Sequence, residues 1–115
     1  MLRMLFGGGT ASPAGADLAP SEAHARAQRG ALLVDVREPD EWRSGHAAGA
    51  RHIPLGQLTR RLAELPEDRE LIMVCRSGNR SGMAVGQLRR AGYTQVRNLR
   101  GGMVAWQRAG LPIER

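Results

Sequence analysis

The feature that most constrains this chain is a short stretch beginning at residue 71. Four apolar residues, 71–74, lead directly into Cys75, the only cysteine of the 115-residue chain. The loop that follows consists of small and cationic residues: Arg76, Ser77, Gly78, Asn79, Arg80 and Ser81. A buried strand that delivers a cysteine into such a loop, with a helix beginning just after it, places backbone N–H groups and a helix N-terminus around one sulfur atom. The stretch therefore predicts a pocket for a thiolate and an anion.

Apolar runs alternate with helical patterns along the rest of the chain. The predicted strands cover residues 31–36, 71–74 and 93–96, and a brief strand is expected to begin near Ile53. The predicted helices cover residues 20–29, 57–64, 80–91 and 103–108, with a turn of helix at 39–43. Strands that alternate with helices indicate an α/β domain built on a parallel sheet with right-handed crossovers.

The length of the chain suits one domain. Residues 1–17 are rich in Gly, Ala, Ser and Pro without apolar periodicity, so we predict a flexible lead-in there and a domain over residues 18–115. No stretch approaches the roughly 20 apolar residues that span a bilayer, and a single cysteine cannot form an internal disulfide. These features predict a soluble protein of the cytoplasm.

The charge of the chain favours small anions as partners. All 17 basic residues are arginine, and the net charge is +6. The arginines form no basic run, and an aromatic content of 3% leaves few rings for base stacking, so nucleic-acid binding is not predicted. The three histidines and one cysteine lack the spacing of a metal site. We therefore predict neither a metal nor a cofactor.

Cys75 is interpreted as a nucleophile. A lone cysteine after a buried strand is most often an inert apolar residue. That role does not require the neighbouring arginines, Arg76 and Arg80, or the small residues between them, which tolerate positive φ. Cationic neighbours and a helix N-terminus favour the thiolate over the thiol. The loop thus predicts an activated sulfur atom.

The spacing within the loop separates two chemistries. Cysteine phosphatases have a similar loop with five residues between cysteine and arginine, whereas four residues separate Cys75 from Arg80. The shorter loop is predicted to be too small for a tetrahedral phosphoryl group. A single sulfur atom fits this loop better than a phosphoryl group does.

As an ordered set, several motifs resemble the single-domain rhodaneses, which are thiosulfate sulfurtransferase-type proteins. The matching motifs lie at residues 33–38 (Leu-Val-Asp-Val-Arg-Glu), 41–42, 45–46, 49–50, 53–54, 75–81 and 98–103, together with Trp106. The resemblance covers residues 18–113. It implies an α/β fold with a five-stranded parallel sheet flanked by helices on both faces, and a cysteine that carries sulfane sulfur as a persulfide.

The resemblance also implies roles for individual residues. Cys75 would bear the persulfide, and the loop that binds the substrate would consist of Arg76, Ser77, Gly78, Asn79 and Arg80. The thiolate would attack the outer sulfur of thiosulfate or a similar donor and pass it to cyanide, a thiol or a protein acceptor. Members specialised for thiosulfate can carry Lys where Ser77 stands, so the preferred donor stays open.

Two other functions stay open. The domain could be a non-catalytic sulfur-carrier or binding module that presents Cys75 only to a protein partner. It could also be a cysteine phosphatase or arsenate reductase on a related scaffold, which the loop length opposes.

Other conspicuous side chains are interpreted as structural. Asp35 and Arg37 follow a predicted strand at the edge where ligands bind in parallel sheets, and we expect them to anchor the pocket wall. His46 is expected to brace a loop, and Trp42 and Trp106 to lie in the core.

Overall fold

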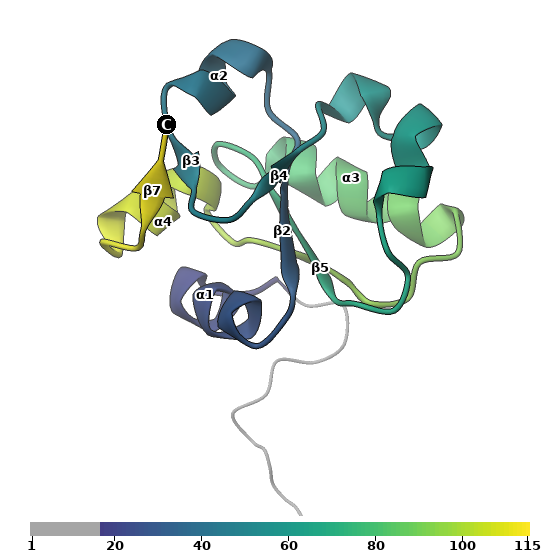
Figure 1. Ribbon diagram of the computed structural model, residues 1–115, viewed down its shortest axis with the longest axis horizontal. Coiled ribbons are helices and arrows are strands. Elements are labelled where there is room, and N and C mark those ends of the chain that lie inside the picture. The colour runs from purple at the N-terminus through teal and green to yellow at the C-terminus, as the bar shows by residue number, and fades with distance from the viewer. Residues whose placement is uncertain (1–16) are drawn as a thin grey trace, which may run out of the picture.

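The computed structural model describes residues 17–115, so all of the predicted lead-in except Asp17 lies outside the described residues (Figure 1). Within residues 17–115 the centre is a four-stranded parallel sheet in the order β4-β2-β5-β6. Its strands are β2 (Leu32–Asp35), β4 (Arg51–His52), β5 (Leu71–Val74) and β6 (Val96–Asn98). Next to β6, Leu18 forms a parallel bridge with Leu99. The α/β fold is confirmed, with this single bridge at the edge of a four-stranded sheet rather than a regular fifth strand.

Helices cover both faces of the sheet (Figure 1). The α-helices are α1 (Pro20–Gln28), α2 (Pro39–Arg43), α3 (Asn79–Arg90) and α4 (Gly102–Arg108). Two 3₁₀ helices, η1 (Leu55–Gln57) and η2 (Thr59–Glu64), follow β4. A small antiparallel pair joins β3 (His46–Ala47) to β7 (Ile113–Glu114), which ties the C-terminal segment to the loop after α2.

The two faces of the sheet have separate hydrophobic clusters because successive strand side chains point to opposite sides. Leu71 and Met73 face α3 and the 3₁₀ helices, whereas Ile72 and Val74 face α1 and α4. Strand β5 is buried along its whole length, as the apolar run predicts. It therefore delivers Cys75 to the carboxyl edge of the sheet from a rigid support.

Two predicted elements differ in the structure. Residues 57–64 form 3₁₀ turns with a break at Arg61 (φ −117°) instead of one α-helix. The third strand begins at Val96 and not at Tyr93, because the Tyr93 N–H still bonds to Leu88 O at the end of α3. The Tyr93 hydroxyl also donates to the carbonyls of Leu62 and Leu65, so this residue ties the 3₁₀ segment to the core.

Three boundaries also shift slightly. The brief strand expected near Ile53 ends one residue earlier, at His52, and Ile53 itself is buried. Helix α3 begins at Asn79 and α4 at Gly102, each one residue before the predicted start. No helix within residues 17–115 is long and apolar enough to cross a membrane.

Candidate active site

Cys75 lies immediately after β5, and its sulfur is surrounded by hydrogen-bond donors. Sγ accepts the backbone N–H of Gly78 at 3.1 Å and the hydroxyl of Ser81 at 3.2 Å. Gly78 precedes α3 with φ +111°, a left-handed conformation that suits glycine and turns its N–H toward the sulfur. The loop thus directs two hydrogen-bond donors at Sγ of Cys75.

Hydrogen bonds control the ionisation of this thiol. Burial raises the pKa of Cys75, but the Ser81 hydroxyl and the backbone amides of Ser81, Gly78 and Ser77 together lower it below the ordinary value. A lower pKa increases the fraction of thiolate, which is the nucleophilic form. The hydroxyl of Ser81 is thus a functional group that the sequence interpretation, centred on the arginines, missed.

Helix α4 supports the loop from its other side. The N–H of Met103 donates to Cys75 O at 2.8 Å, and the N–H of Val104 donates to Arg76 O at 3.1 Å. These bonds use free donors of the first turn of α4. They require a close approach, since Gly102 (φ +56°) lies against the carbonyls of Cys75 and Arg76.

A buried asparagine holds the glycine turn. Asn98, at the end of β6, donates from Nδ2 to Gly78 O at 3.1 Å and to Asp17 Oδ2 at 3.3 Å. Its side chain links the edge of the sheet to the residue whose N–H reaches the sulfur. The motif at residues 98–103 pointed to this region, but not to this contact.

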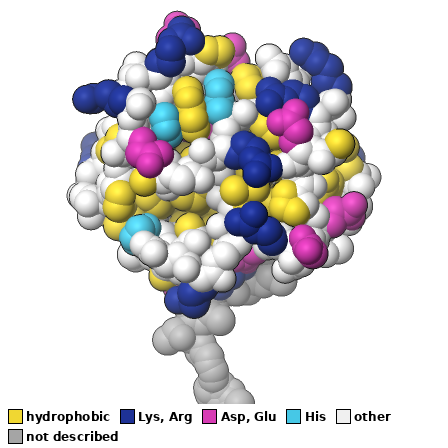
Figure 2. Space-filling model, viewed as in Figure 1, with side chains coloured by type: hydrophobic (Ala, Val, Ile, Leu, Met, Phe, Trp, Pro, Cys, Tyr) yellow, Lys and Arg dark blue, Asp and Glu magenta, His cyan; other side chains and the backbone are white. Residues whose placement is uncertain are grey.

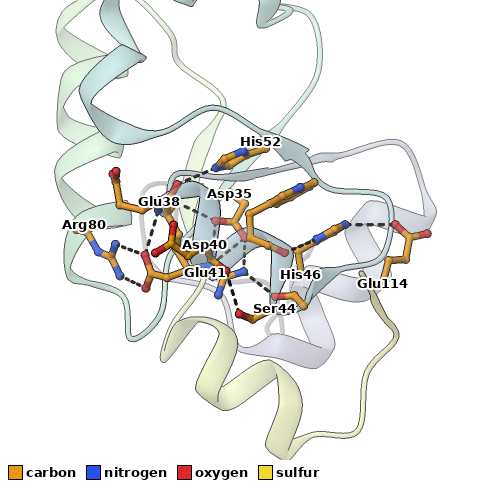
Figure 3. Close-up of polar contacts among 12 residues, drawn as sticks. Asp35, Glu38, Asp40, Glu41, Ser44, His46, His52, Arg80 and Glu114 are labelled. Carbon is orange, nitrogen blue, oxygen red and sulfur yellow. Dashed lines mark hydrogen bonds and ion pairs between the residues drawn. The ribbon is translucent and has the colours of Figure 1, made fainter.

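The two loop arginines differ in their surroundings. The Arg80 guanidinium forms a two-pronged ion pair with Glu41 of α2, at 2.7 and 2.9 Å (Figure 3). The pKa of Arg80 is raised mainly by the hydrogen bonds that it donates to Glu41 and to a smaller degree by the charge of Cys75. Arg76 is exposed, and its guanidinium has no hydrogen-bond or ion-pair partner among residues 17–115. Activation of the thiol therefore depends more on the hydroxyl and amides than on the arginines.

Asp35 and Arg37 anchor the wall beside the loop, as expected. Both side chains are buried, and the carboxylate of Asp35 accepts the Arg37 backbone N–H at 2.9 Å and its guanidinium at 2.9 to 3.0 Å (Figure 3). Arg37 Nη2 also donates to Gly45 O at 2.8 Å. These contacts fix both ends of the segment that contains α2.

The prediction that Trp42 lies in the core is wrong. None of the five residues of α2 is buried, and the Trp42 ring is instead stacked between His46 and His52, with ring centroids at 3.4 and 4.8 Å. Figure 2 shows two histidines flanking a hydrophobic side chain near α2. His46 Nδ1 donates to Trp42 O at 2.9 Å, which confirms its bracing role. Trp106, by contrast, is fully buried as predicted.

A pocket of about 270 Å³ lies between α2 and α4, next to the cysteine loop. Its lining residues are Arg37, Glu41, Ser44, Arg76, Met103, Val104 and Gln107. Of these, only Arg76 belongs to the loop, so it connects the sulfur site to the pocket. Within residues 17–115 no three histidine, cysteine, aspartate or glutamate side chains converge in a way that could hold a metal ion.

Replacing Ser81 with alanine is expected to raise the pKa of Cys75. The loss of a hydrogen bond to a charged sulfur should slow alkylation by iodoacetamide at neutral pH about tenfold. The measurement is the alkylation rate as a function of pH. Ser77→Ala is the matched control, because its backbone N–H is kept and no described contact involves its hydroxyl; equal profiles for both variants would contradict the role of Ser81.

Comparisons with known proteins agree with this geometry. The family model described as "Rhodanese-like domain" matches residues 19–109. A "Sulfurtransferase" of Allochromatium vinosum is 46% identical over 82 residues, which are 71% of this chain and 77% of that protein. The "Thiosulfate sulfurtransferase GlpE" of Stutzerimonas stutzeri is 35% identical over 76% of this chain and 81% of its own length.

A solved structure shows the same fold. The rhodanese-related protein of Thermoplasma volcanium superimposes with a TM-score of 0.79 at 28% identity, over 85% of this chain and 96% of that one. Three further relatives, 40 to 46% identical, are longer, and the chain spans 40 to 62% of their length. With its family model covering most of the described residues, the chain belongs to the rhodanese-like domain family.

Proposed function

We propose that this protein is a sulfurtransferase that moves sulfane sulfur through a persulfide on Cys75. The observation that carries the proposal is the cradle of Gly78 N–H and Ser81 hydroxyl around Sγ, with the unpartnered Arg76 beside it. The cradle activates the sulfur, and the arginine can receive an anion. The two relatives named as sulfurtransferases support this assignment.

The proposed reaction has two displacement steps. The Cys75 thiolate attacks the outer sulfur of the donor, a new S–S bond forms, and the old bond breaks with its electron pair on the leaving group, which is sulfite when thiosulfate is the donor. An acceptor nucleophile then attacks the terminal sulfur of the persulfide and restores the thiolate. The Gly78 N–H and the Ser81 hydroxyl stabilise the charge on Sγ in both steps.

The remaining loop residues are proposed to shape the donor site. Arg76 offers its charge, Arg80 orders the start of α3 through Glu41, and Ser77, Gly78 and Asn79 supply the turn. Thiosulfate is the proposed small donor, supported by the relative named as a thiosulfate sulfurtransferase. Cyanide, a thiol or a protein would accept the sulfur.

The proposed domain covers residues 18–115. Leu18 pairs with Leu99 at the start of this domain, and Glu114 pairs with His46 near its end. The catalytic cycle needs a free thiol, which favours a reducing compartment such as the cytoplasm.

Two assays test the proposed function against its alternatives. With thiosulfate and cyanide the protein is expected to produce thiocyanate, and with p-nitrophenyl phosphate it is expected to release no nitrophenol. The four residues between Cys75 and Arg80 leave little room for a phosphoryl group. Phosphatase turnover without thiocyanate would refute the proposal. Persulfide formation without small-molecule turnover would indicate a sulfur-carrier module.

A further inference from the structure

The charges around the pocket are unevenly compensated. Three arginines lie in the pocket wall or directly behind it. Arg37 is neutralised by the buried Asp35, and Arg80 by Glu41, whereas Arg76 has no ion-pair partner among residues 17–115. A ligand that enters the pocket therefore meets one uncompensated positive charge rather than three.

Glu41 is the residue that cancels the charge of Arg80, one of the two arginines of the cysteine loop. Its Oε1 accepts Arg80 Nη1 at 2.7 Å and the Glu38 N–H at 3.0 Å, and its Oε2 accepts Arg80 Nη2 at 2.9 Å (Figure 3). The contact with Glu38 belongs to the capping box of α2, and the contact with Arg80 lies in the first turn of α3. Two elements thus hold the carboxylate in one place on the pocket wall.

The charge of Glu41 is permanent under working conditions. The hydrogen bond from Arg80, together with the Glu38 N–H, lowers the pKa of Glu41 to about 2. The side chain is 29% exposed, so its field is only partly screened by water. An anion in the pocket consequently meets a fixed negative charge on the same wall as Arg37.

The energy of an anion in this field scales with its own charge. When a positive charge of the site is cancelled, a donor with two negative charges loses twice as much electrostatic attraction energy as a donor with one negative charge. Thiosulfate is a dianion, whereas an organic thiosulfonate or persulfide anion carries one charge and the same kind of transferable sulfur. Glu41 is therefore placed to discriminate between these two donor classes.

Building on the proposed sulfurtransferase function, we propose that Glu41 is a specificity-determining residue that favours singly charged organic sulfane donors over doubly charged ones. Glu41 acts from the pocket wall by neutralising Arg80 behind it, so that Arg76 alone attracts the anionic donor. The protein would then still accept thiosulfate, but it would use an organic persulfide or thiosulfonate anion more readily than it would if Arg80 were not neutralised.

The test compares thiosulfate with methanethiosulfonate, which releases methanesulfinate in place of sulfite. Glu41→Gln keeps an oxygen acceptor for Arg80 but removes the charge. At low salt, kcat/KM is expected to rise about tenfold for thiosulfate and about threefold for methanethiosulfonate. Both increases should shrink as salt is added. The decisive quantity is the ratio of kcat/KM for thiosulfate to kcat/KM for methanethiosulfonate, because a structural defect would lower both kcat/KM values in parallel.

Asp40→Asn is the matched control. Asp40 is the neighbouring carboxylate on α2, it is exposed, and it pairs only loosely with Arg43 at 3.6 Å. The same loss of one charge there should change both kcat/KM values less than about twofold. An unchanged donor ratio in Glu41→Gln, or an equal change in Asp40→Asn, would overturn the proposal.

A second measurement does not depend on sulfur transfer. The rates of Cys75 alkylation by anionic iodoacetate and neutral iodoacetamide are compared, and any change in thiolate fraction cancels in their ratio. Glu41→Gln is expected to raise this ratio about threefold, and Asp40→Asn to leave it unchanged. If the wild-type protein uses neither donor, the proposed function fails and donor selection fails with it. If the ratio of the iodoacetate rate to the iodoacetamide rate is the same in Glu41→Gln as in the wild-type protein, the proposed charge effect of Glu41 itself is refuted.

Discussion

Replacing Cys75 with serine is expected to abolish the gain of one sulfur atom that the wild-type protein shows after mixing with thiosulfate. A serine hydroxyl cannot form a persulfide, because its oxygen is neither ionised at neutral pH nor able to bind sulfane sulfur stably. The measurement is the intact mass of the protein before and after a desalting step. Loss should be complete, since no other cysteine exists in the chain.

The same variant has a clear structural control. Serine is close in size to cysteine, and its oxygen can still accept the Gly78 N–H, so thermal unfolding should change little. A stable Cys75→Ser protein that still gains sulfur would exclude Cys75 as the carrier. A wild-type protein that gains none would refute persulfide formation from this donor.

Replacing Gly102 with alanine is expected to destabilise the protein by about 2 to 5 kcal/mol. A Cβ atom there would overlap the carbonyl oxygen of Cys75 and lie 2.5 Å from Arg76 C and O, and the φ of +56° is unfavourable for alanine. Relief would require α4 to move away from the loop, which would break the bonds from Met103 N–H and Val104 N–H. The free energy of unfolding in urea measures the loss.

Gly110 provides the comparison for this variant. It has a similar φ of +71°, but a Cβ atom there would have no neighbour within 4 Å. Gly110→Ala should therefore cost only the backbone strain, about 1 to 2 kcal/mol. If both variants lose the same stability, close packing of α4 against the cysteine loop does not contribute. A larger loss for Gly102→Ala, with slower alkylation of Cys75, would support it.

These two variants address different parts of the same site. Cys75 is the proposed source of the reacting atom, whereas Gly102 allows α4 to hold the backbone that positions Cys75. The distinction matters because the two donors that lie within hydrogen-bond distance of the sulfur, Gly78 N–H and the Ser81 hydroxyl, both come from residues at the start of α3. The rest of the site acts by fixing this turn.

Some elements follow from local patterns alone. Strand β5 has the predicted bounds, because a short run of four apolar residues is typical of a strand that is covered on both faces of a sheet. Helices α2 and α3 lie within one residue of their predicted ends. The bounds of these elements are set by apolar periodicity, proline and glycine. These signals act on residues that are close together in the chain, so they can be recognised in the sequence.

Other elements depend on partners that are distant in the sequence. Tyr93 reads as a strand residue, but its hydroxyl reaches carbonyls 28 and 31 residues away and keeps the backbone in a turn. Trp42 reads as a core residue, but α2 lies at the surface and its ring is held by two histidines. Such outcomes depend on packing between elements, which local propensity does not encode.

For the candidate active site, the sequence by itself determined the proposed nucleophile, the length of its loop and the family motifs around it, since all of these are matters of residue type and spacing. Only the tertiary structure decided which groups act on the sulfur and which charges reach the substrate. Glu41 and Arg80 are 39 residues apart, and their ion pair exists because α2 packs beside the start of α3. Cys75 and Ser81 are close in sequence, but the left-handed turn at Gly78 is what brings the hydroxyl to the sulfur.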